Sequence, residues 1–392
     1  MNYNNYDDLF VESRPKPPSK ALSKEAFLFT AIVLALLFYG LIVLYSASYD
    51  EAFQNGLKGS YYFTRQLLFA LLGLIVYTII RWIPISLIRR LTPLLLLASF
   101  GLMLLTLFTP WGVTRYGARR WIQIGSLPSF QPSELLKVSA NLFVALLLSK
   151  WDGKSLFTPI ISVVTLLFSS LLIIIQKDYS TTLIFLLGAL ALLVVAGFKV
   201  RYLLLLMVPL TVAATLFLLI EPYRIKRVVS FLFPNIDPSG LNWQVQKALE
   251  AIKSGGVFGR GLGNGVYKLG IIPEVQNDFI FASLAEELGV VGVLLLALLL
   301  LAFTYYGFRV ALHFYRREGE ERFMGYAAFG ITFMIIWQAI VNLAVVTSLL
   351  PPTGIPLPFF SQGGTNLLMI LVECGLLYKF ILYREKEGTD YE

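Results

Sequence analysis

The chain of 392 residues has one cysteine, one histidine and few charged residues, and each scarcity excludes a class of protein. Cys374 by itself rules out a disulfide framework and a cysteine metal cluster. His313 stands in a charged segment, where a solvated surface residue is the simplest interpretation. Charged residues make up 14% of the chain against 57% hydrophobic residues, and the mean hydropathy is +0.72. A water-soluble domain cannot bury this much apolar surface, so lipid must surround most of the chain.

The apolar segments are long and unbroken, which favours membrane helices, because the strands of a membrane barrel alternate apolar and polar residues. At about 20 residues per crossing, the sequence predicts ten spans. We therefore expect an all-α polytopic integral membrane protein with an N-terminal tail (1–24), a membrane domain (25–383) and a C-terminal tail (384–392). The expected spans begin near residues 25, 62, 92, 132, 157, 180, 202, 279, 326 and 365.

The distribution of basic residues predicts the orientation of these spans. Ten crossings place both termini on the same side of the membrane. More than half of the 32 Lys and Arg residues lie in the two tails and in the loops that follow the even-numbered spans. The positive-inside rule therefore places both termini in the cytoplasm.

Two predicted outer segments carry basic residues against this bias. Residues 111–134 contain Arg119 and Arg120, and the predicted large extracytoplasmic loop between the seventh and eighth spans (221–277) contains seven basic residues, among them Lys268. A phosphate-bearing substrate at the outer leaflet explains such groups, and anchoring to anionic lipid headgroups is the alternative. The glycine run in this loop, GGVFGRGLGNG, matches no nucleotide-binding pattern, so we expect no nucleotide.

The segment PSELLK (132–137) has the features of a helix start at the outer side. Pro132 suits the first helical position, and Glu134 suits the positive end of the helix dipole. Lys137 lies one turn further into the apolar span, at a spacing that permits an ion pair with Glu134. For Glu134 a structural role and a ligand role both remain open.

Other polar residues interrupt the apolar spans. Asp178 lies in a short outer turn, and Gln338 and Asn342 present two amides on one face of the ninth span. We expect all three to form hydrogen bonds between helices. The proline-rich segment that follows (351–358) and its continuation SQGGT cannot be helical throughout, so this loop must be buried against protein or line a cavity.

Four acids lie at the start of the eighth span, in IIPEVQNDFIFASLAEEL (271–288). We expect Asp278 at the outer interface, beside the basic loop. At 1.5 Å per residue, Glu286 and Glu287 lie about 12–13 Å deeper, and they point roughly 80° and 180° away from Asp278 around the helix. The three acids therefore do not share one site. We expect Asp278, together with Glu274, to be functional and Glu287 to be structural, while the role of Glu286 stays open.

Seven motifs in order along the chain resemble the SEDS family, the FtsW/RodA peptidoglycan polymerases that act in shape, elongation, division and sporulation. The resemblance covers nearly all of residues 25–383, and Lys268 is similar to the division-type FtsW branch. The sequence departs from the family at Lys177, Lys247–Ala248, Ser348 and Gln362. The motifs are YSAS (45–48), GARRWI (117–122), FQPSELLK (130–137), SGGVFGRGLGNG (254–265), PEVQNDFIFASLAEELG (273–289), QAIVN (338–342) and TGIPLPFFSQGGT (353–365).

The resemblance implies a ten-helix SEDS fold in the bacterial cytoplasmic membrane and lipid II as the substrate. It also implies a class B penicillin-binding protein as transpeptidase partner, alongside other divisome or elongasome proteins, and an essential role for Asp278 in polymerisation. We expect no partnership with nucleic acid and no organic cofactor.

The chemistry of the predicted reaction requires one base, because the pyrophosphate of the donor is already a good leaving group. We hypothesise that Asp278 takes the proton from the incoming sugar 4-hydroxyl, with inversion at the donor. The charge of the pyrophosphate is met by basic residues or by a divalent cation, Mg²⁺ or Mn²⁺, whose ligands the sequence does not identify. The candidates for substrate binding are Arg119, Arg120, Lys137, Lys268, Glu274, Gln244 and Ser361.

Two other functions compete with this interpretation. A flippase for a lipid-linked precursor also has acids and polar helix faces within the membrane. A scaffold without enzymatic activity that recruits a transpeptidase is the third candidate.

Overall fold

The computed structural model describes residues 24–115, 117–199 and 241–389, and within these ranges it confirms the all-α membrane fold. In this part of the chain, eight helices are long and apolar enough to cross a membrane. They are α1 (Lys24–Gln54), α2 (Tyr61–Ile80), α3 (Ile85–Phe108), α4 (Pro132–Ser149), α5 (Phe157–Ile175), α10 (Ile280–Phe314), α11 (Gly319–Val346) and α12 (Gly364–Thr389). A shorter apolar helix, α6 (Tyr179–Val195), occupies the sixth predicted position. The seventh predicted span, near residue 202, lies outside the described residues.

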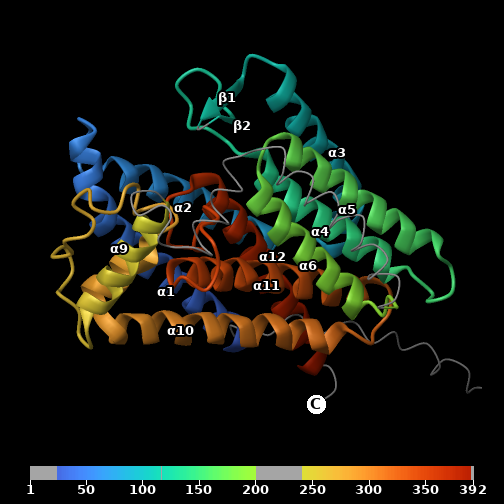
Figure 1. Cartoon of the computed structure of the whole chain (residues 1–392). Coiled ribbons are helices and arrows are strands. Elements are labelled where there is room, and N and C mark those ends of the chain that lie inside the picture. The colour runs from blue at the N-terminus through green and yellow to red at the C-terminus, as the bar shows by residue number, and fades with distance from the viewer. Residues whose placement is uncertain (1–23, 116, 200–240, 390–392) are drawn as a thin grey trace, which may run out of the picture.

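The helices form a bundle with a protein-enclosed centre and a lipid-facing rim. In α4, α12 and α11, 83%, 72% and 61% of the span is buried within the protein, against 28% in α3 and α10. Helix α11 lies beside α10 and also contacts α4 and α6, while α2 packs against α12 (Figure 1). The polar residues that the sequence placed inside spans α4 and α11 therefore face other helices rather than lipid.

A small antiparallel hairpin follows α3, and the sequence analysis did not predict it. Strand β1 (Gly112–Arg115) pairs with β2 (Ala118–Ile122), with Val113 opposite Trp121 and an irregularity after Val113. Gly117, with φ +73°, lies at the turn, where a positive φ suits glycine. The hairpin carries Arg119 and Arg120, so these two guanidinium groups are fixed on a strand rather than on an irregular loop.

Helix α10 is in fact two helices that meet at Gly289, whose backbone angles are φ +62° and ψ −160°. Residues 280–287 before the break are all buried, whereas the part after it exposes Val290, Val291, Leu294 and Leu298. Residues 290–314 extend roughly 37 Å at 1.5 Å per residue, enough to cross a bilayer core of about 30 Å without the first part. The depth of 12–13 Å predicted for Glu286 and Glu287 assumed that both lie on the same straight helix as the membrane span. Because the chain breaks at Gly289, they lie on a separate short helix, and the predicted depth no longer follows.

The glycine-rich segment 255–265 packs its backbone directly onto this break. The amides of Val290 and Val291 donate to the carbonyls of Gly256 and Val257 at 3.0 and 3.2 Å. In the other direction, the amide of Gly261 donates to the Glu287 carbonyl at 2.9 Å. Glycine is required here, because a Cβ at position 259 would lie 2.1 Å from the Glu287 carbonyl oxygen. The glycine run thus permits a close approach of the backbone to α10. This contact ties the end of α9 (Leu241–Gly255) to α10.

Substitution Gly289→Ala tests the break. A Cβ at this position would lie 2.4 Å from the Gly259 nitrogen, on a backbone conformation that L-residues avoid. We expect a loss of at least about 2 kcal/mol of stability, seen as a lower thermal midpoint of the detergent-purified protein. Gly101→Ala in α3 is the matched control, because a Cβ there meets nothing within 4 Å. Equal midpoints for the two variants would contradict the structure.

Candidate functional site

Asp278 lies just before the N-cap of α10, and the main chain around it is fixed by α11. The Asn342 side-chain amide donates to the carbonyl oxygens of Asp278 at 2.8 Å and of Ile355 at 2.7 Å. Asn342 is 1% exposed, whereas Asp278 is half-buried. A Cβ built on Gly354 would lie 3.9 Å from Oδ2 of Asp278. The carboxylate of Asp278 therefore faces the proline-rich loop 351–363.

The two amides of α11 act on this loop, which corrects part of the sequence-based prediction. Nε2 of Gln338 donates to the carbonyl of Pro356 at 2.9 Å, and Asn342 holds Ile355 in the same way. Only Oε1 of Gln338 meets another helix, at 3.5 Å from Nζ of Lys137. Because an irregular backbone inside a bundle lacks its own hydrogen-bond partners, these amides supply them.

The loop 351–363 packs largely against protein, as the sequence predicted for a non-helical segment: residues 357–361 are buried, and Gly354 is exposed. Its Ser361 hydroxyl accepts from the amide of Leu357 at 2.7 Å. Gln66 of α2 donates to the carbonyl of Ser361 and accepts from the amide of Gly363, both at 3.1 Å. The amide of Gln362 donates to the carbonyl of Gln276 at 2.9 Å, which ties the loop to the segment before Asp278. Ser361, a predicted substrate contact, thus shapes the loop from within.

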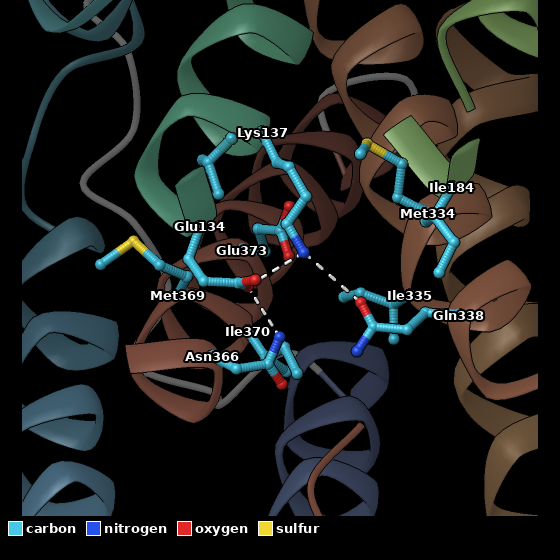
Figure 2. A pocket seen from close by; sticks show the side chains of 11 residues that line it. Glu134, Lys137, Ile184, Met334, Ile335, Gln338, Asn366, Met369, Ile370 and Glu373 are labelled. Carbon is cyan, nitrogen blue, oxygen red and sulfur yellow. Dashed lines mark hydrogen bonds and ion pairs between the residues drawn. The ribbon is translucent and has the colours of Figure 1, made fainter. Parts of the chain in front are cut away.

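A small pocket of about 20 Å³, which is room for about one water molecule, lies between α4, α11, α12 and α6 (Figure 2). Nζ of Lys137 lies 2.9 Å from Oε2 of Glu134, so the ion pair that the spacing permitted is formed. Nδ2 of Asn366 donates to the same oxygen at 2.7 Å. The pocket is lined by Glu134, Lys137, Val138, Ile184, Met334, Ile335, Gln338, Asn366, Met369, Ile370 and Glu373.

The sequence analysis missed Glu373 and Asn366, which both come from α12. Glu373 is 6% exposed and reaches the space that Lys137 points into (Figure 2). The signal was present, since an acid inside the apolar run ILVECGLL is costly in a membrane helix without a partner. The pocket therefore brings two carboxylates and one ammonium together within the protein-enclosed part of the bundle.

The hairpin arginines are anchored to neighbouring main chain and to Asp178. Arg119 donates to the carbonyl of Thr109, and Arg120 donates to the carbonyls of Gln176 and Lys177. Nη1 of Arg120 also lies 3.5 Å from Oδ1 of Asp178. Asp178 in turn caps α6 by accepting from the amide of Thr181 at 3.4 Å. These bonds fix the hairpin to the N-terminal end of α6, and both arginines remain half-buried.

Glu274 and Gln244 lie on the segments that lead into α10. Glu274 has φ +50° and accepts at Oε2 from the side-chain amide of Asn277 at 2.8 Å. Its own amide donates to Glu51 of α1 at 3.2 Å. Glu274 is thus part of the turn that carries Asp278. Gln244 is half-buried on α9.

Glu286 and Glu287 find their partners chiefly in the loop before α10. Glu286 accepts from the amide of Val266 at 2.7 Å. Glu287 lies 2.7 Å from Nζ of Lys268 and accepts from Ser46 of α1. Lys268 is 3% exposed, so this predicted substrate contact is buried in an internal ion pair.

The comparisons with known proteins identify the family of the chain. The sequence pattern of the FtsW/RodA/SpoVE family, described as cell cycle proteins, matches residues 26–386. The chain belongs to this family. It is 37% identical over 363 residues to the stage V sporulation protein E of Bacillus subtilis, covering 91% of this chain and 96% of that protein. It is 34% identical over 352 residues to a probable peptidoglycan glycosyltransferase FtsW of Borreliella burgdorferi, covering 88% and 93%.

Two solved structures share the fold. One is a chain from a peptidoglycan synthase complex that coordinates polymerisation and crosslinking, with a TM-score of 0.74, 27% identity and coverage of 92% of this chain and 98% of that chain. The other is the rod shape determining protein RodA of Thermus thermophilus, with a TM-score of 0.67, 25% identity and coverage of 94% and 99%.

Substitution Lys137→Met tests the charge balance of the pocket. It leaves the buried carboxylates of Glu134 and Glu373 without their cation, and breaking a buried pair in this way costs roughly 3–5 kcal/mol. We expect a clear drop in the thermal midpoint, and partial recovery when Glu134→Gln is added.

The control for this prediction is an exposed pair of the same i,i+3 spacing on α9, Lys247 and Glu250, 2.7 Å apart. The hydrogen bond from Lys247 lowers the pKa of the Glu250 carboxyl, but both groups face solvent. Lys247→Met should leave the midpoint unchanged. A Lys137→Met variant as stable as this control would refute the buried pair.

Proposed function

We propose that this protein is a peptidoglycan glycosyltransferase that polymerises lipid II at the outer face of the bacterial cytoplasmic membrane, in cell division or cell-shape maintenance. The family and its peptidoglycan glycosyltransferase relatives support the reaction class. The observation that carries the site is the half-buried Asp278, whose main chain is bonded to α11 and which faces the loop 351–363. A half-buried carboxylate on a main chain that is fixed in this way has the chemistry of a general base for a reacting hydroxyl.

The proposed reaction needs one proton acceptor. The 4-hydroxyl oxygen of the acceptor sugar attacks C1 of the donor sugar, and its proton passes to the carboxylate of Asp278. The bond from C1 to the phosphate oxygen breaks, and the lipid pyrophosphate leaves with the electron pair. Attack opposite to the leaving group inverts the donor α-linkage to β.

The negative charge on the leaving pyrophosphate requires cationic partners. Arg119, Arg120 and Lys137 are our candidates, because the two arginines are half-exposed at the outer end and Lys137 lines the pocket. Among the described residues no group of three or more His, Cys, Asp or Glu side chains has the geometry of a metal site. We therefore propose that a Mg²⁺ or Mn²⁺ ion is held by substrate phosphates and at most one or two carboxylates. Asp278 and Glu274 are the candidate ligands.

Two neighbouring functions remain as outcomes of the tests. The charged pocket within α4, α11 and α12 is a feature that a flippase for the same lipid also requires. We also propose that the protein works beside a class B penicillin-binding protein, as suggested by its likeness to a chain of a synthase complex. Both termini are proposed to be cytoplasmic, from the distribution of basic residues.

Substitution Asp278→Asn tests the assignment of the base. The amide keeps the shape of the side chain but does not accept the hydroxyl proton, so we expect polymerisation of labelled lipid II in detergent to fall by about 10²–10⁴-fold. Asp152→Asn is the control, because Asp152 accepts two backbone amides in an exposed turn.

Each alternative function gives a different result in this assay. Unimpaired polymerisation by Asp278→Asn would refute the base. A wild-type protein that moves lipid II across liposomes but makes no glycan in detergent would identify a flippase. A scaffold would make no glycan, and its Asp278→Asn variant would still support growth.

Removal of divalent cations tests the metal proposal. We expect EDTA to abolish glycan synthesis by the wild-type protein and Mg²⁺ or Mn²⁺ to restore it. The thermal midpoint should not change with EDTA, because the described residues provide no preformed metal site. Full activity in EDTA would contradict the metal proposal and would mean that basic residues alone neutralise the pyrophosphate charge.

A further inference from the structure

We propose that four buried residues, Ser46, Lys268, Glu286 and Glu287, form a carboxylate clamp that sets the position of Asp278 for the reaction. The inference rests on the proposed function and assigns these residues as positioning residues rather than substrate contacts. It follows from three features: the saturation of the polar atoms in the clamp, the rigidity of the short helix that links the clamp to Asp278, and the anchoring of that helix at its other end.

The ammonium group of Lys268 is fully used within the protein. It has three N–H donors, and Nζ lies 2.7 Å from Oε1 of Glu287, 2.9 Å from the hydroxyl of Ser46 and 3.1 Å from the carbonyl of Ser46. The side chain is 3% exposed. No donor is therefore left for the phosphates of a substrate, and binding one would break an internal bond.

The partners of Lys268 are saturated in the same way. The hydroxyl of Ser46 donates to Glu287 at 2.6 Å and accepts from Lys268 and from the amide of Gly263 at 3.2 Å, which uses its one donor and both acceptor positions. Oε2 of Glu287 also accepts from the amide of Gly263 at 3.2 Å. Glu287 thus joins α1 and the loop before α10 to the end of the short helix.

Glu286 accepts hydrogen bonds from the next part of the same loop. Its Oε1 accepts from the amide of Val266 at 2.7 Å and its Oε2 from the amide of Tyr267 at 3.2 Å. The guanidinium of Arg260 lies 3.6 Å from Oε1. Glu286 and Glu287 are 0% and 1% exposed. The two carboxylates point in different directions from one helix end. They accept hydrogen bonds from backbone amides that have no acceptor within the loop itself.

The short helix 280–288 connects the clamp to Asp278. Its residues from Ile280 to Glu287 are all buried, and the chain breaks at Gly289 directly after it. At the other end, Asn342 holds the carbonyl of Asp278. A helix held at both ends and packed on all sides moves as one body, so the clamp at one end defines where the other end lies.

Stability alone does not account for a buried ion pair at this place. Replacing such a pair by apolar residues of similar size is often neutral or stabilising, because desolvation offsets the attraction between the charges. The double variant Lys268→Met/Glu287→Leu therefore separates the two explanations. It removes both charges without leaving one of them unpaired, but it also removes the bonds to Ser46 and to the amide of Gly263.

The experiment compares this double variant with the wild-type protein in steady-state polymerisation of lipid II. We expect a thermal midpoint close to that of the wild type, a kcat lower by about 100-fold and an unchanged KM, since a displacement of about 1 Å at a reacting group costs this much. The control is Lys247→Met/Glu250→Leu, which removes the exposed pair on α9 and should change neither constant. A wild-type kcat would overturn the proposal, and so would a raised KM with an unchanged kcat, because it would make Lys268 a substrate contact.

A second variant keeps the proposal testable if the double variant does not fold. In Glu286→Gln one carboxylate oxygen becomes an amide donor, so one of the amides of Val266 and Tyr267 loses its acceptor. We expect faster hydrogen exchange in residues 260–268 together with a lower kcat. Faster exchange with an unchanged kcat, or unchanged exchange, overturns the clamp. If the wild-type protein makes no glycan at all, the proposed function fails, while the exchange measurement still reports whether the clamp holds the loop.

Discussion

The break of α10 at Gly289 is the constraint on which the structure around Asp278 depends. It separates a short buried helix from the lipid-facing span and exposes backbone carbonyls and amides at the junction. The glycine-rich segment 255–265 satisfies these groups with its own main chain, at a distance that admits no side chain at Gly259. In a solvent of lipid, irregular backbone persists only where protein supplies its partners. The close packing of two backbones is therefore what permits a helix to stop and turn inside the protein.

The same requirement explains where the polar side chains of the bundle lie. Gln66 of α2, and Gln338 and Asn342 of α11, each donate to a carbonyl of the loop 351–363. Membrane helices usually avoid such amides, because removing an amide from water costs free energy that only a hydrogen-bond partner offsets. Here the partners are main-chain atoms, so the amides convert two helices into a frame for a non-helical loop. Asp278 lies against this frame and takes its orientation from it.

Much of the fold could be predicted because membrane spans leave a strong signal. A run of about 20 apolar residues marks a span whatever its neighbours are, and nine of the ten expected spans correspond to helices among the described residues. The role of Gly289 could not be predicted, because a single glycine in an apolar run has the same appearance whether the helix continues or breaks. The hairpin at residues 112–122 is short, and its pairing depends on a neighbouring strand rather than on local periodicity.

The sequence indicated the acidic residues around Asp278 but not the partners of their side chains. The acid-rich stretch 274–287 was evident from its cost in a membrane, and helical geometry correctly separated Asp278 from Glu286 and Glu287. Their partners were not evident, because Val266, Tyr267 and Gly263 contribute only backbone amides, which every residue carries. Glu373 stands alone among apolar residues in the sequence. Its polar neighbours in the pocket are far away along the chain, because most of them come from other helices.

The number of hydrogen-bond donors that a buried lysine already uses within the protein distinguishes a supporting residue from a candidate for substrate binding. Lys268 and Lys137 are both buried lysines, and the sequence analysis predicted substrate binding for both. The three donors of Lys268 end on protein acceptors within 3.1 Å. Lys137 has a short contact to Glu134, a longer one of 3.5 Å to Gln338, and lines a pocket. Because a cation that binds a phosphate must offer a donor without first losing one, Lys137 has the geometry for binding and Lys268 has the geometry for support.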